Sequence, residues 1–170
     1  IGSNDGIMLQ NFSDWHVGHL GIEPSRNVAE VAINKGINTW CEFFDVKLAD
    51  KIIREYGKAD AVLSANTMCQ FGDMKTILTG VKKLLKEKGV LIFEDPYIGD
   101  ILKKTSYDQI YDEHELYFSA LSVQNLAKMY GLELVKVEHQ EVHGGELRYT
   151  LAKVGAYKVS QSVTDQIKKE

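Results

Sequence analysis

The stretch LELVKVEHQEVHGGELRYTLAK, residues 132–153, decides the fold class of this chain. Its apolar spacing predicts two successive strands, Leu132–Glu141 and Glu146–Lys153, which form a hairpin around His143-Gly144-Gly145. So short a connection has no room for the crossover helix that joins parallel neighbours, so we expect an antiparallel pair. An ordinary dinucleotide-binding sheet, whose strands all run parallel, does not end in this way.

The chain before this pair alternates short apolar runs with helical segments, which is typical of a parallel sheet with crossover helices. Gly89–Glu94 is the clearest strand, and residues 95–119 show no regular pattern. The other expected strands are Val17–Ile22, Ile37–Trp40 and Asp60–Ala65, with Ile1 as the last residue of a first, truncated strand. The expected helices are Ile7–Trp15, Ser25–Lys35, Val46–Tyr56, Asp73–Lys86 and Ala120–Tyr130.

Composition limits the classes of partner. The chain has 170 residues, enough for one domain, and its 44% of hydrophobic residues can build a core. A net charge of -4 argues against nucleic acid as the main partner, because binding phosphates requires a basic face. We find no run of apolar residues long enough to span a membrane, so no membrane partner is expected.

The two cysteines, Cys41 and Cys69, form neither a CxxC motif nor a metal-ligand cluster. We therefore expect reduced thiols, a cytoplasmic protein and no metal in this chain. The chain begins at Ile1, inside a predicted strand, and this suggests a piece of a longer protein.

Candidate ligand-binding residues follow the ends of the predicted strands, where open α/β sheets bind their ligands. Glycines allow a close approach of the backbone, the oxygens of Glu23 match a ribose diol, and an aromatic ring with a carboxylate suits adenine. This reasoning selects Gly2, Ser3, Asn4 and Gly6 in the first turn, Glu23 and Pro24 after the second strand, Phe44 and Asp45 after the third, and Asn66 after the fourth.

The first turn does not carry the fingerprint of NAD-binding proteins. Starting from Gly2, the pattern G-x-G-x-x-G requires glycine at positions 4 and 7, where this chain has Asn4 and Ile7. An NAD-dependent dehydrogenase is therefore a distant alternative.

Several motifs together resemble the sugar C-methyltransferases, which methylate carbon three of nucleotide-linked 4-keto-deoxysugars. The resemblance runs from Ile1 to about Lys153 and is most specific over residues 107–119. The motifs are IGSNDG (1–6), GIEPS (21–25), IFEDPY (92–97), YDQIYDEH (107–114), YFS (117–119) and HGGELR (143–148).

The resemblance implies a fold, a cofactor and a domain plan. The fold is an α/β, Rossmann-like class I methyltransferase fold, with a mostly parallel seven-stranded sheet, an antiparallel last strand and helices on both faces. The cofactor is S-adenosylmethionine (SAM). Residues 1–155 would form the SAM-binding domain, and residues 156–170 would begin a C-terminal segment or domain. The family also has an N-terminal zinc-binding domain, which this chain lacks.

Carbon methylation next to a ketone requires a base. Histidine suits this role, because the ordinary pKa of an imidazole lies near working pH, and we assign it to His114, with Glu113 orienting it and Tyr111 donating to the enolate oxygen. Tyr97, Gln70, His143 and Arg148 are the candidate substrate-binding residues. The substrate would be a small molecule, a nucleotide-linked keto sugar.

Two departures from the family pattern keep alternatives open. Asp112 and Gln70 stand where the family usually has histidines, and glutamine carries no proton at neutral pH. A SAM-dependent methyltransferase with an oxygen or nitrogen acceptor, and a non-catalytic SAM-binding module, are the alternatives. The sequence does not indicate the oligomeric state.

Overall fold

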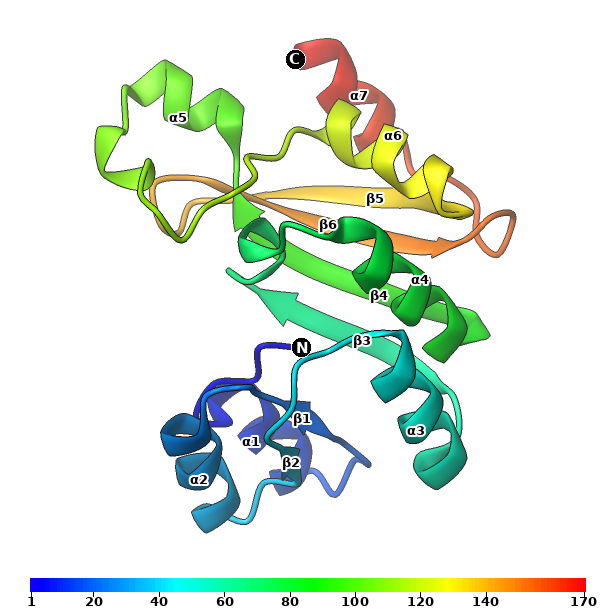
Figure 1. Ribbon diagram of the computed structural model, residues 1–170. Coiled ribbons are helices and arrows are strands. Elements are labelled where there is room, and N and C mark those ends of the chain that lie inside the picture. Colours follow the sequence, from blue (N-terminus) through cyan, green and yellow to red (C-terminus); the bar gives the residue numbers. More distant parts are fainter.

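The computed structural model describes all residues, 1–170 (Figure 1). The strands are β1 (Gly21–Ile22), β2 (Thr39–Trp40), β3 (Ala59–Ala65), β4 (Leu85–Pro96), β5 (Leu132–Gln140) and β6 (Glu146–Lys153). The α-helices are α1 (Ile7–Asp14), α2 (Arg26–Asn34), α3 (Val46–Tyr56), α4 (Met74–Leu84), α5 (Ile98–Lys104), α6 (Ala120–Met129) and α7 (Gln161–Lys169). Two short 3₁₀ helices are η1 (Met68–Gln70) and η2 (Tyr107–Gln109).

The larger sheet confirms the prediction from the closing strand pair. Its order is β3-β4-β6-β5, with β3 and β4 parallel and β6 antiparallel to both of its neighbours. The last strand is thus inserted between β4 and β5. Beyond the edge at which β3 and β4 end, α5 and the segment that follows it extend away from the sheet (Figure 1).

The expected single seven-stranded sheet is wrong in detail, because the structure has six strands in two sheets. β1 and β2 form a separate parallel pair. Between β1 and β3 the chain offers only its first residues: the amino group of Ile1 donates to the Leu63 carbonyl at 2.8 Å, and the Ser3 N–H donates to the Ile22 carbonyl at 3.1 Å. The first residues therefore make one hydrogen bond to β3 and one to β1, whereas a full strand would make a continuous series of hydrogen bonds with both.

The core lies between the larger sheet and the helices α3, α4 and α6, and Figure 1 shows these helices on one side of that sheet. In β4, Leu91 and Phe93 point toward this side and are buried, whereas the alternate residues Val90 and Ile92 are only half-buried. Helices on both faces were expected, but α1 and α2 lie with the small sheet (Figure 1). The opposite face of the larger sheet therefore remains partly open.

Two helices were not expected from the sequence. α5 lies in the stretch interpreted as irregular, and α7 lies in the segment predicted to begin a further unit. α7 is capped by the Ser160 side chain and places Val163 in the main core, so it packs on the same domain. Whether it also begins another domain stays a prediction.

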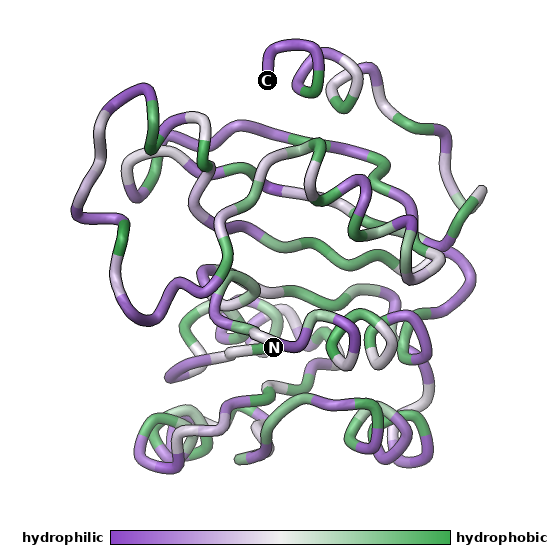
Figure 2. The backbone as a smooth tube through the Cα atoms, turned by 45° about the horizontal axis from the view of Figure 1, so that its top comes forward, coloured by the Kyte–Doolittle hydropathy of each residue, from purple (hydrophilic) through white to green (hydrophobic).

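The hydropathy pattern agrees with this arrangement. The strands in the middle of the larger sheet are the most continuously hydrophobic part of the backbone, whereas the helices alternate between polar and apolar residues (Figure 2). No helix combines the length and the apolar character that crossing a membrane demands.

Candidate active site

The first turn packs directly against the end of β3. Gly2 has φ +62°, a conformation that side-chain-bearing residues rarely adopt. A Cβ atom at Gly2 would collide with the side chain of Thr67, two residues beyond β3. Glycine is therefore required for the turn to approach the β3 end so closely, and this brings two predicted binding segments together.

Glu23 is fixed by two backbone hydrogen bonds. Its side chain lies at the end of β1 and is 8% exposed. Oε2 accepts from the N–H of Asn4 at 3.0 Å, and Oε1 accepts from the N–H of Ser25 at 2.9 Å. The carboxylate therefore holds the first turn in place, and each oxygen retains acceptor capacity for another donor.

Asn66 marks the point at which the chain leaves β3. Its φ is +50°, and asparagine is among the few side-chain-bearing residues that tolerate this region. Its N–H donates to the Glu94 carbonyl at 2.8 Å, and its carbonyl accepts from Gln70 Nε2 at 3.0 Å. The glutamine that departs from the family pattern thus fastens η1 to the end of β3.

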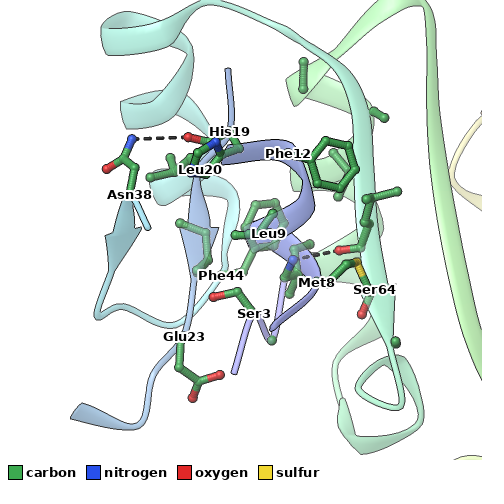
Figure 3. Close-up of a pocket in the computed structure, with 18 of the residues that line it drawn as sticks. Ser3, Met8, Leu9, Phe12, His19, Leu20, Glu23, Asn38, Phe44 and Ser64 are labelled. Atoms are coloured by element: carbon green, nitrogen blue, oxygen red, sulfur yellow. Dashed lines mark hydrogen bonds between the residues drawn. The ribbon is translucent and has the colours of Figure 1, made fainter. Parts of the chain in front are cut away.

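These segments surround a cavity of about 1400 Å³. At one end lies Glu23, while apolar side chains such as Leu9 and Phe44 line the part between β1 and β3 (Figure 3). The cavity thus combines a polar rim at the strand ends with an apolar slot between the two sheets. Its wall includes most of the predicted cofactor residues, namely Gly2, Ser3, Asn4, Glu23, Pro24, Phe44 and Asn66, and two predicted substrate residues, Gln70 and His143.

The region after β2 differs from the expectation. Phe44 is 5% exposed and belongs to the hydrophobic core, so its ring is not a free surface at the strand ends, whereas Phe43 is 77% exposed. Asp45 caps α3 by accepting from the Leu48 N–H at 2.7 Å. Gly6 serves packing, because a Cβ there would lie 3.0 Å from the Ile37 side chain. Gly6 and Asp45 do not line the cavity.

His114 is held in a defined tautomer. The side chain is 7% exposed, and its Nδ1 lies 3.0 Å from the Gln109 carbonyl oxygen. A carbonyl only accepts hydrogen bonds, so neutral His114 carries its proton on Nδ1 and leaves a lone pair on Nε2. This is the form that a general base requires.

Tyr111 packs on His114, with ring centroids 4.2 Å apart. Burial raises the pKa of Tyr111, and the neighbouring Glu113 raises it further, so its hydroxyl stays a donor at neutral pH. The Glu113 side chain is exposed.

The predicted base does not line the same cavity as Glu23. The three predicted catalytic residues, Tyr111, Glu113 and His114, lie in the segment 107–118, no residue of which lines the cavity. This segment contacts η1 through a hydrogen bond from the Leu116 N–H to the Cys69 carbonyl at 3.0 Å. Gln70, the next residue, lines the cavity. η1 is therefore the structural link between the cofactor-side residues and the predicted catalytic residues.

The remaining predicted substrate residues are engaged within the protein. Tyr97 is buried, and this burial, with Glu170 nearby, raises the pKa of its hydroxyl. Arg148 Nε donates to Glu94 Oε2 at 2.7 Å, which occupies part of the guanidinium proposed for a phosphate. Neither residue lines the cavity.

Two buried carboxyl groups escaped the sequence analysis. Asp95 and Glu146 are both 0% exposed, near the point at which β4 ends and β6 begins. Burial raises the pKa of Asp95 to about 6, although its Oδ1 accepts from the Cys69 N–H at 3.3 Å. For Asp95, a signal was present in the sequence, because it directly follows the apolar run of the predicted strand Gly89–Glu94. No group of three or more His, Cys, Asp or Glu side chains is arranged to hold a metal ion.

Sequence comparison gives two matches. Residues 1–137 match the family described as "Methyltransferase domain". The chain is also 32% identical to C-methyltransferase NovU of Streptomyces niveus over 171 aligned residues, which cover 100% of this chain and 41% of that protein. The chain thus spans about two fifths of the length of this relative.

Solved structures share the fold. A SAM-dependent methyltransferase from Clostridium acetobutylicum superposes with a TM-score of 0.68 at 15% identity, covering 91% of this chain and 82% of that one. Magnesium protoporphyrin IX methyltransferase of Synechocystis, solved with bound S-adenosylhomocysteine, gives 0.66 at 11% identity, covering 89% and 71%. These likenesses show the Rossmann-like methyltransferase fold. Since the family match covers most of its length, the chain belongs to the methyltransferase-domain family.

Proposed function

We propose that this chain binds SAM and transfers its methyl group to a carbon next to the ketone of a nucleotide-linked deoxysugar. One observation carries the cofactor half: Gly2 in the first turn, Glu23 after β1 and Asn66 after β3 line a single cavity. The carbon acceptor is supported by the similarity to a protein named as a C-methyltransferase and by the motif of residues 107–119. The aligned part of this relative is 41% of its length.

The residues at the strand ends fit the cofactor. Glu23 has acceptor capacity left on both oxygens, which suits the adjacent hydroxyls of a ribose. The Ser3 hydroxyl, which lines the cavity, has no hydrogen-bond partner within the protein. A buried hydroxyl without a partner costs free energy, and a polar ligand at this place would remove that cost. The Gly2 turn brings backbone within reach of the ligand.

In the proposed reaction SAM supplies an electrophilic methyl group on its sulfonium. His114 Nε2 removes the proton from the carbon next to the ketone, and the electron pair of that C–H bond forms the enolate. With SAM bound, this carbon would form a bond to the methyl group as the S–CH₃ bond breaks. The electron pair of that bond would stay on sulfur, which gives neutral S-adenosylhomocysteine, and the enolate would return to the ketone. The proton stays on His114 until solvent takes it, so charge and atoms balance.

Tyr111 stabilises the enolate in this scheme. Its raised pKa keeps the proton on the phenol at neutral pH, so the hydroxyl donates to the oxygen on which negative charge develops. A well-placed donor of this kind contributes about 3 kcal/mol to transition-state stabilisation. For His114 to act together with SAM, the segment 107–118 has to bring Nε2 to the Gln70 side of the cavity.

Two measurements test the proposal. Calorimetry should detect binding of SAM and of S-adenosylhomocysteine and no binding of NAD. Mass spectrometry after incubation with SAM and a nucleotide-linked 4-keto sugar should show the gain of one methyl group. A deuterium placed on the carbon next to the ketone should be lost, because the methyl group takes its place. SAM binding without transfer to any keto sugar would favour the non-catalytic module, and methylation of a hydroxyl or an amine would favour the other acceptor class.

A further inference from the structure

Glu146 is a buried carboxyl group to which no function has yet been attached. It is the first residue of β6, is 0% exposed, and neither Oε1 nor Oε2 has a hydrogen-bond partner in the protein. An ionised carboxylate in such a place would lose its hydration without compensation, which is far more costly than burying the neutral acid. The geometry therefore favours a protonated Glu146.

Sheet register places a second carboxyl group beside it. In the antiparallel ladder Glu94 lies opposite Arg148 and Pro96 lies opposite Glu146, so Glu94 and Glu146 are diagonal neighbours on one face. A negative charge on one of two neighbouring carboxyl groups disfavours ionisation of the other. Arg148 Nε donates to Glu94 Oε2 at 2.7 Å, so Glu94 has a cationic partner, whereas Glu146 has none and is the group for which the neutral form is favoured.

The pair is connected to the wall of the cavity. The side chain of Asn66 is a polar neighbour of the Glu146 carboxyl group. The Asn66 carbonyl in turn accepts from Gln70, and both Asn66 and Gln70 line the cavity. A chain of polar contacts thus runs from Arg148 through Glu94, Glu146 and Asn66 to Gln70.

The charges that face Glu146 come from three elements. Glu94 and Asp95 lie on β4, Arg148 lies on β6, and the Cys69 thiol lies in η1 close to Asp95. Burial raises the pKa of Glu146 to about 7, and Glu94 and Asp95 raise it while Asn66 opposes the shift. The protonation change therefore falls within the range in which enzymes are assayed.

We propose that Glu146 is a positioning residue, whose neutral, protonated form allows it to lie beside Glu94 and Asn66 without charge repulsion and so keeps the end of β3 in the shape that binds the cofactor. This inference rests on the proposed SAM-binding function. When Glu146 loses its proton, two adjacent carboxylates repel each other beneath Asn66 and the cavity wall shifts. Cofactor affinity then falls as the pH rises.

The test compares S-adenosylhomocysteine binding by calorimetry at pH 6 and pH 8 in the wild type, Glu146→Gln and Glu141→Gln. In the wild type Kd should rise roughly tenfold from pH 6 to pH 8. With a pKa of about 7, the fraction of the protein in which Glu146 is protonated, which is the form that binds tightly, falls by about tenfold over this range. Glu146→Gln keeps a neutral donor in the same shape, so its Kd should change less than about twofold. Glu141→Gln, an exposed site in the same hairpin, should behave as the wild type.

Equal pH profiles in the wild type and Glu146→Gln would overturn the inference and leave the proposed function intact. Absence of binding in the wild type at both pH values would instead overturn the proposed function, and the inference with it. If Glu146→Gln does not fold, the carboxyl ¹³C resonance of Glu146 in the wild type decides. Titration near pH 7 supports the inference, and titration near pH 4.5 overturns it.

Discussion

The two halves of the candidate site are built differently. On the cofactor side, each segment is held by the sheet or by a neighbouring segment. Glu23 accepts from the Asn4 N–H in the first turn, Gly2 packs against Thr67 beyond β3, and the Asn66 N–H donates to the Glu94 carbonyl of β4. On the acceptor side, the segment 107–118 is held mainly at its end, where Leu116 bonds to η1 and Phe118 bonds to Ile98. Tyr107, 82% exposed, and Tyr111, 47% exposed, lie on its outer surface.

This difference separates what the sheet determines from what the loop determines. Strand ends in a packed sheet have few alternative positions, so the cofactor residues are set by the fold. An exposed segment with few buried contacts opens at a low free-energy cost, and such segments commonly carry substrate specificity. We therefore expect mutations on the two sides to separate binding of the cofactor from turnover.

The largest effect should come from His114→Ala. Removing the proposed base should lower the rate of methyl transfer by roughly 10²–10⁴-fold, which is the usual contribution of a positioned general base. Binding of SAM, measured by calorimetry, should stay within about threefold of the wild type. Tyr107→Phe in the same segment is the matched control and should leave both quantities unchanged. Wild-type turnover in His114→Ala would contradict the assignment of His114 as the base.

Glu23→Ala should produce the converse pattern. The change removes the partner of two backbone N–H groups as well as the proposed ribose acceptor, at a cost of about 1–3 kcal/mol for each group left unsatisfied. The Kd of Glu23→Ala for SAM should rise roughly 30-fold or more. Glu23→Gln keeps one accepting oxygen, so its Kd should lie between those of the wild type and Glu23→Ala. Calorimetry measures both. Unchanged Kd values would mean that Glu23 only clamps the turn.

The buried carboxyl group of Asp95 should make the stability of the protein depend on pH. Asp95 has a folded-state pKa raised to about 6 by burial, so between about pH 4 and pH 6 the folded protein holds a proton that the unfolded chain releases. The free energy of unfolding should therefore fall as the pH rises through this window, by about 2–3 kcal/mol.

Asp95→Asn removes this titration, so its stability relative to the wild type should increase from pH 4 to pH 7 by the same amount. Thermal unfolding measures the difference, at roughly 2–4 °C per kcal/mol for a chain of this size. A constant difference across the window would show that Asp95 is not in a dry environment.

The smallest effect should follow Asp73→Ala, which touches neither half. Asp73 caps α4 by accepting from the Thr76 N–H at 3.1 Å and from the Thr76 hydroxyl at 2.7 Å. Loss of such a cap costs about 1 kcal/mol of stability. Chemical denaturation should detect this loss, while Kd for SAM and the turnover rate at 25 °C should not change. A large change in either would show that the scaffold and the site are coupled through η1 and α4.

The sequence predicted the sheet well wherever a local pattern was sufficient. The strand pair on either side of His143-Gly144-Gly145 required antiparallel neighbours, and β6 takes this direction. The number of strands in one sheet was wrong, because only Ile1–Ser3 lie between β1 and β3. α5 was missed because a helix of seven residues has too few turns for a clear apolar period.

The site residues show the same limit. Glycine and acidic residues at strand ends were predictable, since topology brings those ends together. Which of two adjacent phenylalanines faces the core was not predictable, and Phe44 rather than Phe43 is buried. The pairing of Glu94 with Arg148 and the burial of Glu146 depend on the register of β4 and β6, which residue spacing alone does not give.

A crystal structure of the protein with bound S-adenosylhomocysteine tests the central claim most directly. We expect both ribose hydroxyls to lie within hydrogen-bond distance of Glu23 Oε1 and Oε2. The sulfur should be directed past Asn66 and Gln70 toward His114 Nε2. A ligand bound elsewhere on the molecule, or one whose sulfur points away from the segment 107–118, would contradict it.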